Sequence, residues 1–470
     1  MKFCGATIAT GLLVAASLAS GAGQEAESHS AAPSNSSVQS ELDLGLPPLP
    51  VAEGESDLDL ALPPLEGLEP QESASAVFDS VLPETASSSE WDRGFSGYVG
   101  AEAFVFGTDG IAPSQDYDTN TSAVLEPEFE FRNEQRRITL RFVPFGRLDQ
   151  RDDERTHVDI RELSFLKEFE ASDILVGFSQ VYWGSTESVH VVDVINQTDL
   201  VEDLDQEAKL GQPMINPNFY TDLGRFSFFV MPYFRERTFP GQNGRLRTQP
   251  RIEGDRAIYE SSAEEWHPDL ALRWSRTIGD LDLGLSYFWG TTREPVYVID
   301  RRDPADVVLR PFYEIVHQPA LDFTYASGKW LLKGEAIYRE GQRDGDFIRS
   351  AAGFEYTVSG LFGSRTDLGL IGEYLYDCAG NNDINPFEND IAYGLRFSLN
   401  DLRNTSILVS AITDSNDGST FVNLEAKMRL GNHWVARAEA RTCASIPRGD
   451  FPLNGFRRDR YILFGLEYHF

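Results

Sequence analysis

The chain has 470 residues, a formal net charge of −33 and three cysteines. Its acidic pI of about 4.5 argues against a basic nucleic-acid-binding surface, and three cysteines are too few for a disulfide scaffold. After residue 22 no apolar run reaches the roughly 20 residues that a membrane-spanning helix needs, which excludes a helical protein with several spans.

Residues 1–22 have the pattern of a secretory signal peptide. Lys2 gives a short positive start, an apolar stretch rich in Ala and Leu ends near Ala19, and small residues follow it. A single membrane anchor is the alternative, but the apolar stretch is short for a span. We therefore expect cleavage near residues 20–23 and export of the mature chain.

Residues 23–92 form an acidic extension rich in proline and serine. From Glu25 to Asp92 the chain carries 15 acidic residues and neither lysine nor arginine. Such a segment has too little apolar surface to fold, so we expect it to be disordered in the periplasm. Residues 42–65 contain a Leu/Asp/Pro motif twice. The repeat fits a stiff spacer, and docking to a periplasmic partner is the alternative.

From residue 93 to residue 470 apolar and polar residues alternate again and again, which is typical of β-strands with two different faces. In the last strand the apolar face ends in Tyr468 and Phe470, whereas the polar faces of several strands carry charge. Strands of about ten residues span an apolar band of ~25 Å when tilted by roughly 40°. Because strands cross a membrane only as a closed sheet, the pattern predicts a transmembrane antiparallel up-and-down β-barrel with a polar interior.

Turn signals set the expected number of strands. Eight short turns and nine longer polar segments make 18 strands, with both chain ends on the periplasmic side. The weakest strand, at about 207–219, contains Pro213 and Pro217, and proline removes a ladder donor, so 16 strands remain the alternative. A barrel of either size is wide enough for an aqueous channel, which predicts a pore for passive diffusion of small hydrophilic solutes.

The export signal, the alternating strands and the terminal segment 461–470 resemble outer-membrane barrel proteins of the porin type from Gram-negative bacteria. The resemblance covers about residues 93–470 and implies an outer-membrane location and contact with lipid and lipopolysaccharide. It also implies that Tyr468 and Phe470 form an assembly signal for the barrel assembly machinery. A finer similarity, to porin-like barrels of undefined function, implies no substrate and is carried by Trp183-Gly184, Asp193-Val194-Ile195-Asn196, Asp199 and residues 234–241.

The segment 184–206 is acidic and is the third external loop in this topology. In porin-like barrels that loop often folds inward, so the resemblance implies that it narrows the channel. The candidate constriction residues are the carboxylates Asp193, Asp199, Asp203 and Asp205. An acidic loop that faces outward is one alternative. A calcium site is another, although the spacing is not that of an EF-hand, and we expect no metal.

The fourth loop carries basic constriction candidates, namely Arg235, Arg237, Arg245 and Arg247. Arginine binds carboxylates and phosphates through a planar fork. The cluster therefore either opposes the acidic third loop inside the channel or faces outward toward lipopolysaccharide. Alternating charges further along the chain mark candidates for the lumen wall, which can also pair across strands: Arg396, Glu425, Lys427, Arg429, Arg437, Glu439 and Arg441.

Cys378 and Cys443 both fall at the external side in this topology. They lie in the seventh and ninth loops, where the compartment permits a disulfide. The bond needs Cα atoms within about 7 Å of each other, so a disulfide and two free thiols are the alternatives.

Two other functions compete with a pore. A structural or adhesive barrel with a plugged lumen would use its long external loops as contact surfaces. An outer-membrane hydrolase would need a nucleophile with a base, but no Gly-x-Ser-x-Gly motif occurs and the seven histidines are scattered, with His267 near the external rim. We therefore predict a protein that is not an enzyme and has no cofactor and no nucleic-acid partner.

Overall fold

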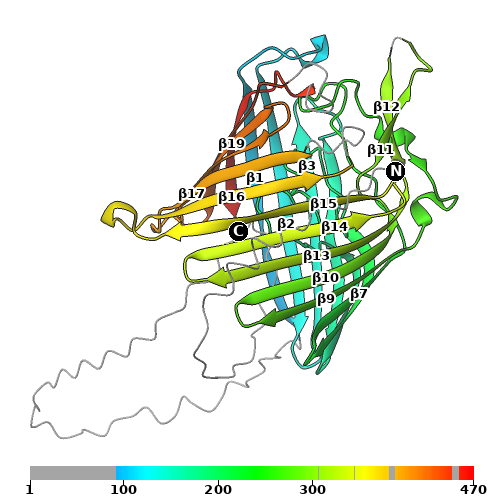
Figure 1. The fold of residues 1–470 in the computed structure, drawn as a ribbon, viewed down its shortest axis with the longest axis vertical. Helices are drawn as coiled ribbons and strands as arrows, with labels where there is room; N and C mark the ends of the chain where they lie inside the picture. The colour runs from blue at the N-terminus through cyan, green and yellow to red at the C-terminus, as the bar shows by residue number, and fades with distance from the viewer. Residues whose placement is uncertain (1–90, 305, 343–344, 380–386, 447–454) are drawn as a thin grey trace, which may run out of the picture. The chain divides into compact units, whose positions relative to one another are not determined.

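The barrel is a single antiparallel sheet that closes on itself. The computed structural model describes residues 91–304, 306–342, 345–379, 387–446 and 455–470. Eighteen strands pair in chain order, and the first, β1, pairs with the last, β21 (Figure 1). The predicted signal peptide, the acidic extension and its repeat lie outside the described residues.

The barrel strands run through the chain in three groups of six. The first group is β1 Asp92–Phe106, β2 Thr119–Asn133, β3 Ile138–Asp149, β4 His157–Glu168, β5 Ser172–Ser179 and β6 Gln212–Thr221. The second group is β7 Gly224–Met231, β9 Asp269–Ile278, β10 Leu281–Thr291, β13 Ile315–Ser327, β14 Trp330–Arg339 and β15 Phe347–Val358. The third group is β16 Asp367–Asp377, β17 Asn389–Ser398, β18 Ser406–Asp414, β19 Thr420–Leu430, β20 Trp434–Ala444 and β21 Tyr461–His469.

The connections make the two ends of the barrel different. Eight turns join strands at one end, as predicted, and nine connections, most of them longer, form the other, which we call the long-loop end. A small sheet lies in the long connections and consists of β8 Ile258–Tyr259, β11 Val296–Asp300 and β12 Val308–Tyr313. The helical elements are 3-10 turns, namely η2 Pro113–Gln115, η3 Gly254–Arg256, η4 Glu264–Trp266 and η5 Leu361–Gly363. None of the helices in the described residues is long and apolar enough to span a membrane.

The alternation of residue types separates an apolar outer surface from a polar interior. In β21, Ile462 and Leu466 are each 43% exposed, whereas Tyr461 and Glu467 are 6% and 8% exposed. Successive side chains of a strand point to opposite faces, so the apolar row covers the outside of the barrel and the polar row lines its interior. This arrangement matches the one that the sequence predicts.

The strand with two prolines is a full member of the barrel. Pro213 and Pro217 lie in β6, which pairs with β5 on one side and with β7 on the other. The β6–β7 ladder has a gap around Pro217. There the Asn216 side-chain amide donates a hydrogen bond to the Phe228 carbonyl, 2.7 Å away. A side chain thus replaces the donor that proline lacks, and the barrel has eighteen strands and not 16.

A β-bulge interrupts the alternation in β4. The register between β3 and β4 shifts at Val143 and Pro144, and Arg161 has no directly opposed residue. Bulges re-aim side chains. As a result, the sequence neighbours Arg161 and Glu162 both reach charged partners, with Arg161 lying 2.7 Å from Asp199 and Glu162 lying 3.0 Å from Arg141.

Candidate functional site

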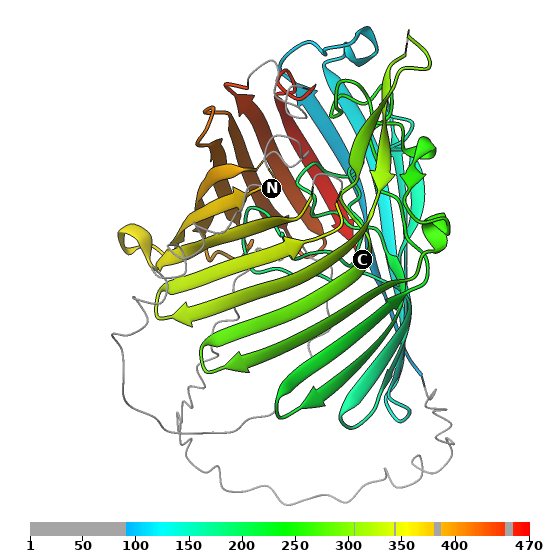
Figure 2. The same cartoon turned by 45° about the vertical axis from the view of Figure 1, so that its right-hand side comes forward.

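The connection between β5 and β6, residues 180–211, crosses the interior of the barrel, and we call it the inner loop (Figure 2). Its Glu187 carboxylate forms an ion pair with Arg396 of β17. Around the closed ring β17 lies nine places from β5, so in a barrel of eighteen strands this pair reaches the opposite wall. Lys333 of β14 lies 3.3 Å from the same carboxylate. Side chains of the far wall therefore hold the inner loop.

Two buried wall carboxylates bind the tip of the inner loop through its backbone. Glu335 of β14 accepts hydrogen bonds of 3.2 Å or less from the N–H groups of Ser185, Thr186 and Val192. Glu373 of β16 accepts hydrogen bonds of 2.9 Å or less from the N–H groups of Glu187 and Ser188. A carboxylate that accepts several N–H bonds forms strong, charge-assisted contacts, so these two residues fix the position of the tip.

The four predicted constriction carboxylates lie in the inner loop and bind three different cations. Asp193 lies 3.0 Å from Lys209, and Asp199 lies 2.7 Å from Arg161. Asp203 and Asp205 both pair with Arg441 of β20, Asp205 at 3.0 Å. Because the carboxylates are distributed over three cations, the four do not converge on one point, and the arrangement does not build the calcium site considered from the sequence.

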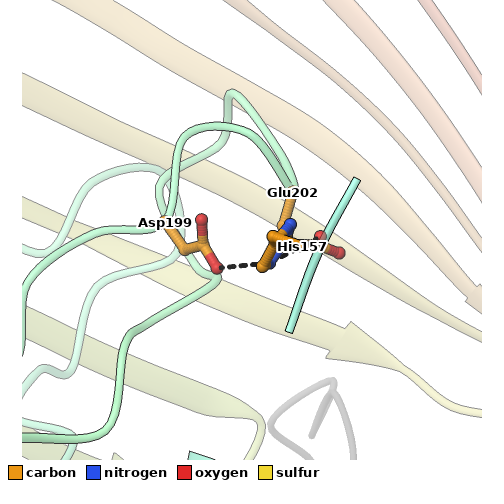
Figure 3. Close-up of side chains that lie close together, drawn as sticks. All are labelled: His157, Asp199 and Glu202. Carbon is orange, nitrogen blue, oxygen red and sulfur yellow. Dashed lines mark ion pairs between the residues drawn. The ribbon is translucent and has the colours of Figure 1, made fainter. Parts of the chain in front are cut away.

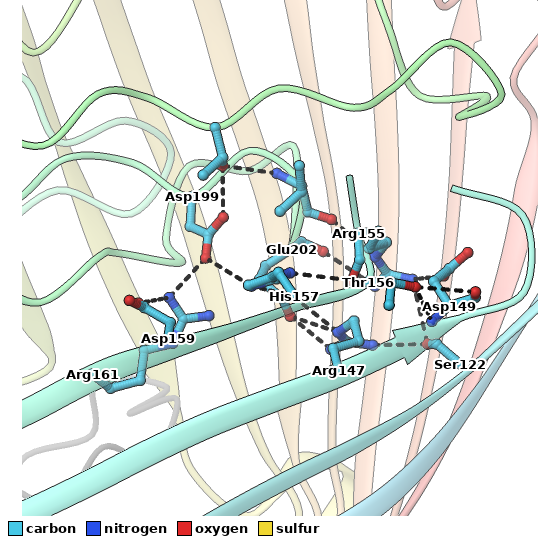
Figure 4. A network of polar contacts seen from close by, with 12 residues as sticks. Ser122, Arg147, Asp149, Arg155, Thr156, His157, Asp159, Arg161, Asp199 and Glu202 are labelled. Carbon is cyan, nitrogen blue, oxygen red and sulfur yellow. Dashed lines mark hydrogen bonds and ion pairs between the residues drawn. The ribbon is translucent and has the colours of Figure 1, made fainter. Parts of the chain in front are cut away.

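A network of arginines and carboxylates ties the inner loop to β3 and β4 (Figure 4). Arg147 of β3 lies 2.7 Å from Glu202 of the inner loop and 2.5 Å from Glu102 of β1. Arg155 adds a second contact to Glu102 at 3.2 Å and donates a hydrogen bond to the Val201 carbonyl at 2.9 Å. The loop is thus held on this side as well as on the far wall.

His157, Asp199 and Glu202 are the one group of described residues with the donor types and spacing of a metal site (Figure 3). The His157 Nε2 atom lies 3.8 Å from Asp199 and 3.6 Å from Glu202. Both carboxylates already bind guanidinium groups, Asp199 that of Arg161 and Glu202 that of Arg147. Two arginines beside the same oxygens would repel a cation, so the group fits an ion-pair network and not a metal site.

The basic candidates Arg235 and Arg237 lie in the connection between β7 and β9, residues 232–268, which we call the outer loop. Arg235 lies 2.8 Å from Asp159 of β4. Arg237 donates a hydrogen bond of 3.3 Å to the Gln197 side chain of the inner loop. Both arginines therefore face the interior and contact the acidic elements of the barrel.

The other two basic candidates, Arg245 and Arg247, are buried in the outer loop. Arg245 is 2% exposed and lies 2.9 Å from Asp459, in the connection between β20 and β21. Arg247 is 7% exposed and has no ion-pair partner among the described residues. Burial of both side chains removes the alternative in which they face outward toward lipopolysaccharide.

The candidates for the lumen wall lie on β17, β19 and β20 and mostly take part in ion pairs. Arg437 lies 2.9 Å from Glu102 and from Glu467. Glu439 lies 2.7 Å from Arg441. Arg396 pairs with Glu355 at 2.9 Å as well as with the inner loop. The remaining candidates occupy the same face of β19 and are Glu425, Lys427 and Arg429.

An apolar cluster joins the inner loop to one side of the barrel. Val192, Val194 and Ile195 of the inner loop are almost fully buried, with exposures of 0% to 3%. They pack in one cluster with wall side chains from β6, β7, β9, β10 and β13 to β15, namely Met214, Phe229, Met231, Ala271, Phe288, Val316, Ile337 and Phe347. The interior is therefore filled by a hydrophobic core on this side, which the alternating sequence pattern did not predict.

A cavity of about 740 Å³ lies beside the start of the inner loop. Its lining includes Gly184 and Ser185 together with the turn after β6, the end of β9 and the start of β10. Its wall side chains are mainly hydroxyl, carboxylate and guanidinium groups, among them Arg225, Arg273 and Asp322. The barrel therefore has a polar cavity, large enough for many water molecules, at its short-turn end.

Neighbouring carboxylates change the titration of one group in the inner loop. Burial lowers the pKa of His190, but the contact with Glu335 and the Asp193 charge outweigh burial and raise it. The acidic surroundings of the inner loop therefore favour the protonated form of this histidine.

Two features correct or extend the sequence analysis. Cys378 and Cys443 do not form a disulfide with each other. Cys378 directly follows β16 and Cys443 lies in β20, four strands away at about 4.8 Å per strand, which exceeds the reach of a disulfide. The sequence analysis did not predict three residues of the site. A β-bulge decides the role of Arg161, a partner distant in the chain that of Glu373, and the conformation of a loop that of Asp459.

Comparisons with known proteins find similarity in structure. No protein-family model matches the chain, and no curated protein matches it. A solved triple mutant of Rhodopseudomonas blastica porin is 11% identical, with a TM-score of 0.38 over 81% of this chain and 100% of that chain. A structure described as "Asymmetric conductivity of engineered proteins" is 12% identical, with a TM-score of 0.40 and the same coverage. The strand pairing itself establishes the fold.

Proposed function

We propose that the protein is an outer-membrane pore for passive diffusion of small hydrophilic solutes. The observation that carries the proposal is the inner loop, which crosses a barrel of eighteen strands and pairs with the opposite wall through Glu187 and Arg396. A barrel of this size has room for an aqueous channel, and a loop held across it by charges narrows that channel without filling it. The apolar outer surface of the strands fits a lipid environment.

The proposed permeation path runs beside β19, β20 and β21, away from the apolar cluster. Along this path Arg441 binds Asp203, Asp205 and Glu439, so three carboxylates share one guanidinium group. Elsewhere the inner-loop carboxylates have cationic partners of their own, as Asp193 has Lys209. We therefore expect a modest preference for cations, because only a small negative excess remains at the crossing.

Location and partners follow from the same proposal. The protein would reside in the outer membrane of a Gram-negative bacterium, in contact with lipid and lipopolysaccharide. Tyr468 and Phe470, at the end of the last strand, would be read by the barrel assembly machinery. No catalytic step is required, because diffusion through a pore needs neither a nucleophile nor a cofactor.

Single-channel recording of the purified protein in a planar bilayer tests the proposal. Steady ohmic steps, with a reversal potential of the cation-selective sign in a salt gradient, are expected. Glu187→Gln should raise the step size because it removes the charge pair that spans the barrel. Glu130→Gln is the matched control, since Glu130 pairs with Arg132 at 2.9 Å, away from the inner loop. A folded, inserted protein that never conducts would refute the pore.

A plugged structural or adhesive barrel is the second candidate function. Two observations favour it: the apolar cluster fills one side of the interior, and the outer loop contacts other loops across the long-loop end. Such a barrel would hold its long connections rigidly for contact with another surface. Absence of conductance in the wild type and in the Glu187→Gln variant, together with normal folding, would support this function.

A further inference from the structure

The outer loop crosses the long-loop end of the barrel. It starts from β7, and its Arg245 pairs with Asp459, next to β21, which lies seven places from β7 around the ring of eighteen strands. Its backbone carbonyl at Gly244 accepts a hydrogen bond of 2.7 Å from Gln115, which follows β1. The segment from the end of β7 to these two contacts therefore spans from one rim of the barrel nearly to the opposite rim.

Two further connections also hold the same segment, and the connection between β1 and β2 contacts it a second time. Tyr117, before β2, donates a hydrogen bond of 2.9 Å to the Asn243 carbonyl. Asp152, between β3 and β4, accepts a hydrogen bond of 3.0 Å from the Gly241 N–H group. Thr238 donates a hydrogen bond of 2.6 Å to Asp199 of the inner loop. The outer loop is thus tied to four separate connections, those between β1 and β2, β3 and β4, β5 and β6, and β20 and β21.

The Arg245 guanidinium is the central contact of the crossing. It lies in the buried ion pair with Asp459, donates a hydrogen bond of 3.0 Å to the Tyr117 carbonyl and stacks over the Phe106 ring at 4.3 Å. Breaking a buried ion pair by removal of one partner is strongly unfavourable, because the other charge stays buried. Arg245 therefore favours the crossing position of the outer loop.

Arg247, two residues further on, has the opposite effect. It is buried, its Nε atom has no hydrogen-bond partner, and none of the described carboxylates forms an ion pair with it. Burial and the neighbouring Arg251 charge lower its pKa, although the charges of Asp152, Asp459 and Asp306 oppose this shift. A buried cation that forms no ion pair with the described carboxylates disfavours the state that buries it. The crossing position thus combines one stabilising and one destabilising arginine.

We infer that the outer loop is a lid over the external mouth of the barrel, whose closed position is favoured by Arg245 with Asp459 and opposed by the buried charge of Arg247. The inference rests on the proposed pore for its consequence, which is that the lid sets how often the pore is open. The lid itself is a statement about loop position and is measurable without conductance.

Access of a reagent to the space below the lid tests the inference. Leu204 of the inner loop lines a cavity of about 40 Å³ together with Leu246 of the outer loop. In a background that carries Cys378→Ala and Cys443→Ala, a thiol introduced by Leu204→Cys would be labelled with a membrane-impermeant maleimide. Arg245→Met should raise the labelling rate at least about tenfold, and Arg247→Met should lower it, because the two changes remove opposite contributions.

Each arginine variant serves as the control for the other, since both remove a buried guanidinium from the same segment but should change the labelling rate in opposite directions. Heat-modifiable mobility on a gel verifies that each variant folds. Gln115→Ala, which removes the contact to Gly244, should also raise labelling. Equal rates in the wild type and in the Arg245→Met and Gln115→Ala variants would overturn the lid, as would faster labelling in Arg247→Met.

Parallel bilayer recordings separate the lid from the pore. Faster labelling in Arg245→Met accompanied by more frequent opening supports both inferences. Faster labelling in a protein that never conducts supports the lid and refutes the pore. Conductance that is the same in all variants, with unchanged labelling, supports the pore and refutes the lid.

Discussion

Replacement of Glu335 by glutamine should release the tip of the inner loop from the barrel wall. The Glu335 Oε1 atom accepts hydrogen bonds from the N–H groups of Ser185 and Thr186, at 2.6 and 2.9 Å, and from the Thr186 hydroxyl at 2.7 Å. Its Oε2 atom accepts one from the Val192 N–H group at 3.2 Å. The side chain is 3% exposed, so water cannot easily reach these groups, and the loss of a hydrogen bond is costly.

The magnitude follows from these four contacts. Hydrogen bonds to a charged group contribute about 1.5–3 kcal/mol each, and neutral ones about half as much. Glutamine keeps one acceptor oxygen, so the three bonds to that oxygen weaken by about 1 kcal/mol each. Its amide N–H would oppose the Val192 N–H group and leave that buried donor unsatisfied, at a cost of about 1–3 kcal/mol. With partial relaxation, the docking of the tip should weaken by about 3–5 kcal/mol.

Limited proteolysis of the folded barrel measures this change. In the wild type, cleavage within residues 180–211 requires the tip to leave the wall, so the initial rate reports the docking equilibrium. Glu335→Gln should be cleaved there at least about a hundred times faster, because 1.4 kcal/mol corresponds to a factor of about ten. Glu130→Gln is the control and should behave as the wild type. Cleavage of Glu335→Gln at the wild-type rate would refute the role assigned to this carboxylate.

Three further predictions concern charge, pH and thiols. Arg441→Gln leaves Asp203 and Asp205 without their cation, so the reversal potential in a salt gradient should shift toward stronger cation selectivity; an unchanged potential would place the path elsewhere. Burial raises the pKa of Asp459 to about 6, although Arg245 opposes the shift. With the lid open the pKa of Asp459 should return to about 4. The closed state therefore binds the proton more tightly, because Arg245 offsets only part of the cost of burying the ionised carboxylate. Acidification from pH 7 to pH 5 should therefore favour closure, and opening should be regained above pH 6, whereas Asp459→Asn should abolish this dependence; greater conductance at pH 5 would contradict it. Thiol titration of the unfolded protein should give equal values with and without prior reduction, because no disulfide joins Cys378 and Cys443, and a higher value after reduction would reveal one.

The sequence predicts the barrel well because its signal is local. A strand with one face toward lipid repeats every two residues, and each short turn is marked by its own residues. The number of strands also follows, even though Pro217 weakens the signal of β6. The compensating hydrogen bond from Asn216 to Phe228 depends on the neighbouring strand, so it is invisible in the local pattern.

The interior is predicted much less well, because its contacts are remote in the chain. The acidic character of residues 184–206 is evident in the sequence, but the partners of each carboxylate are not. Asp203 binds Arg441, and Glu187 binds Arg396, across 238 and 209 residues respectively. Nothing in the spacing selects these arginines from the others on the polar faces. The apolar cluster was missed because Val192, Val194 and Ile195 lie in a loop, where the alternation of strands does not apply.

The pairing of the inner loop with late strands has a consequence for the order of assembly. Residues 180–211 are synthesised before β14, β16, β17 and β20, which provide Glu335, Glu373, Arg396 and Arg441. The loop therefore cannot dock until the C-terminal half of the chain has wrapped around it, and contacts of such long sequence separation form slowly. Until then the carboxylates of the loop lack these partners. Closure of β1 on β21 and capture of the loop would then be late events, coupled in time.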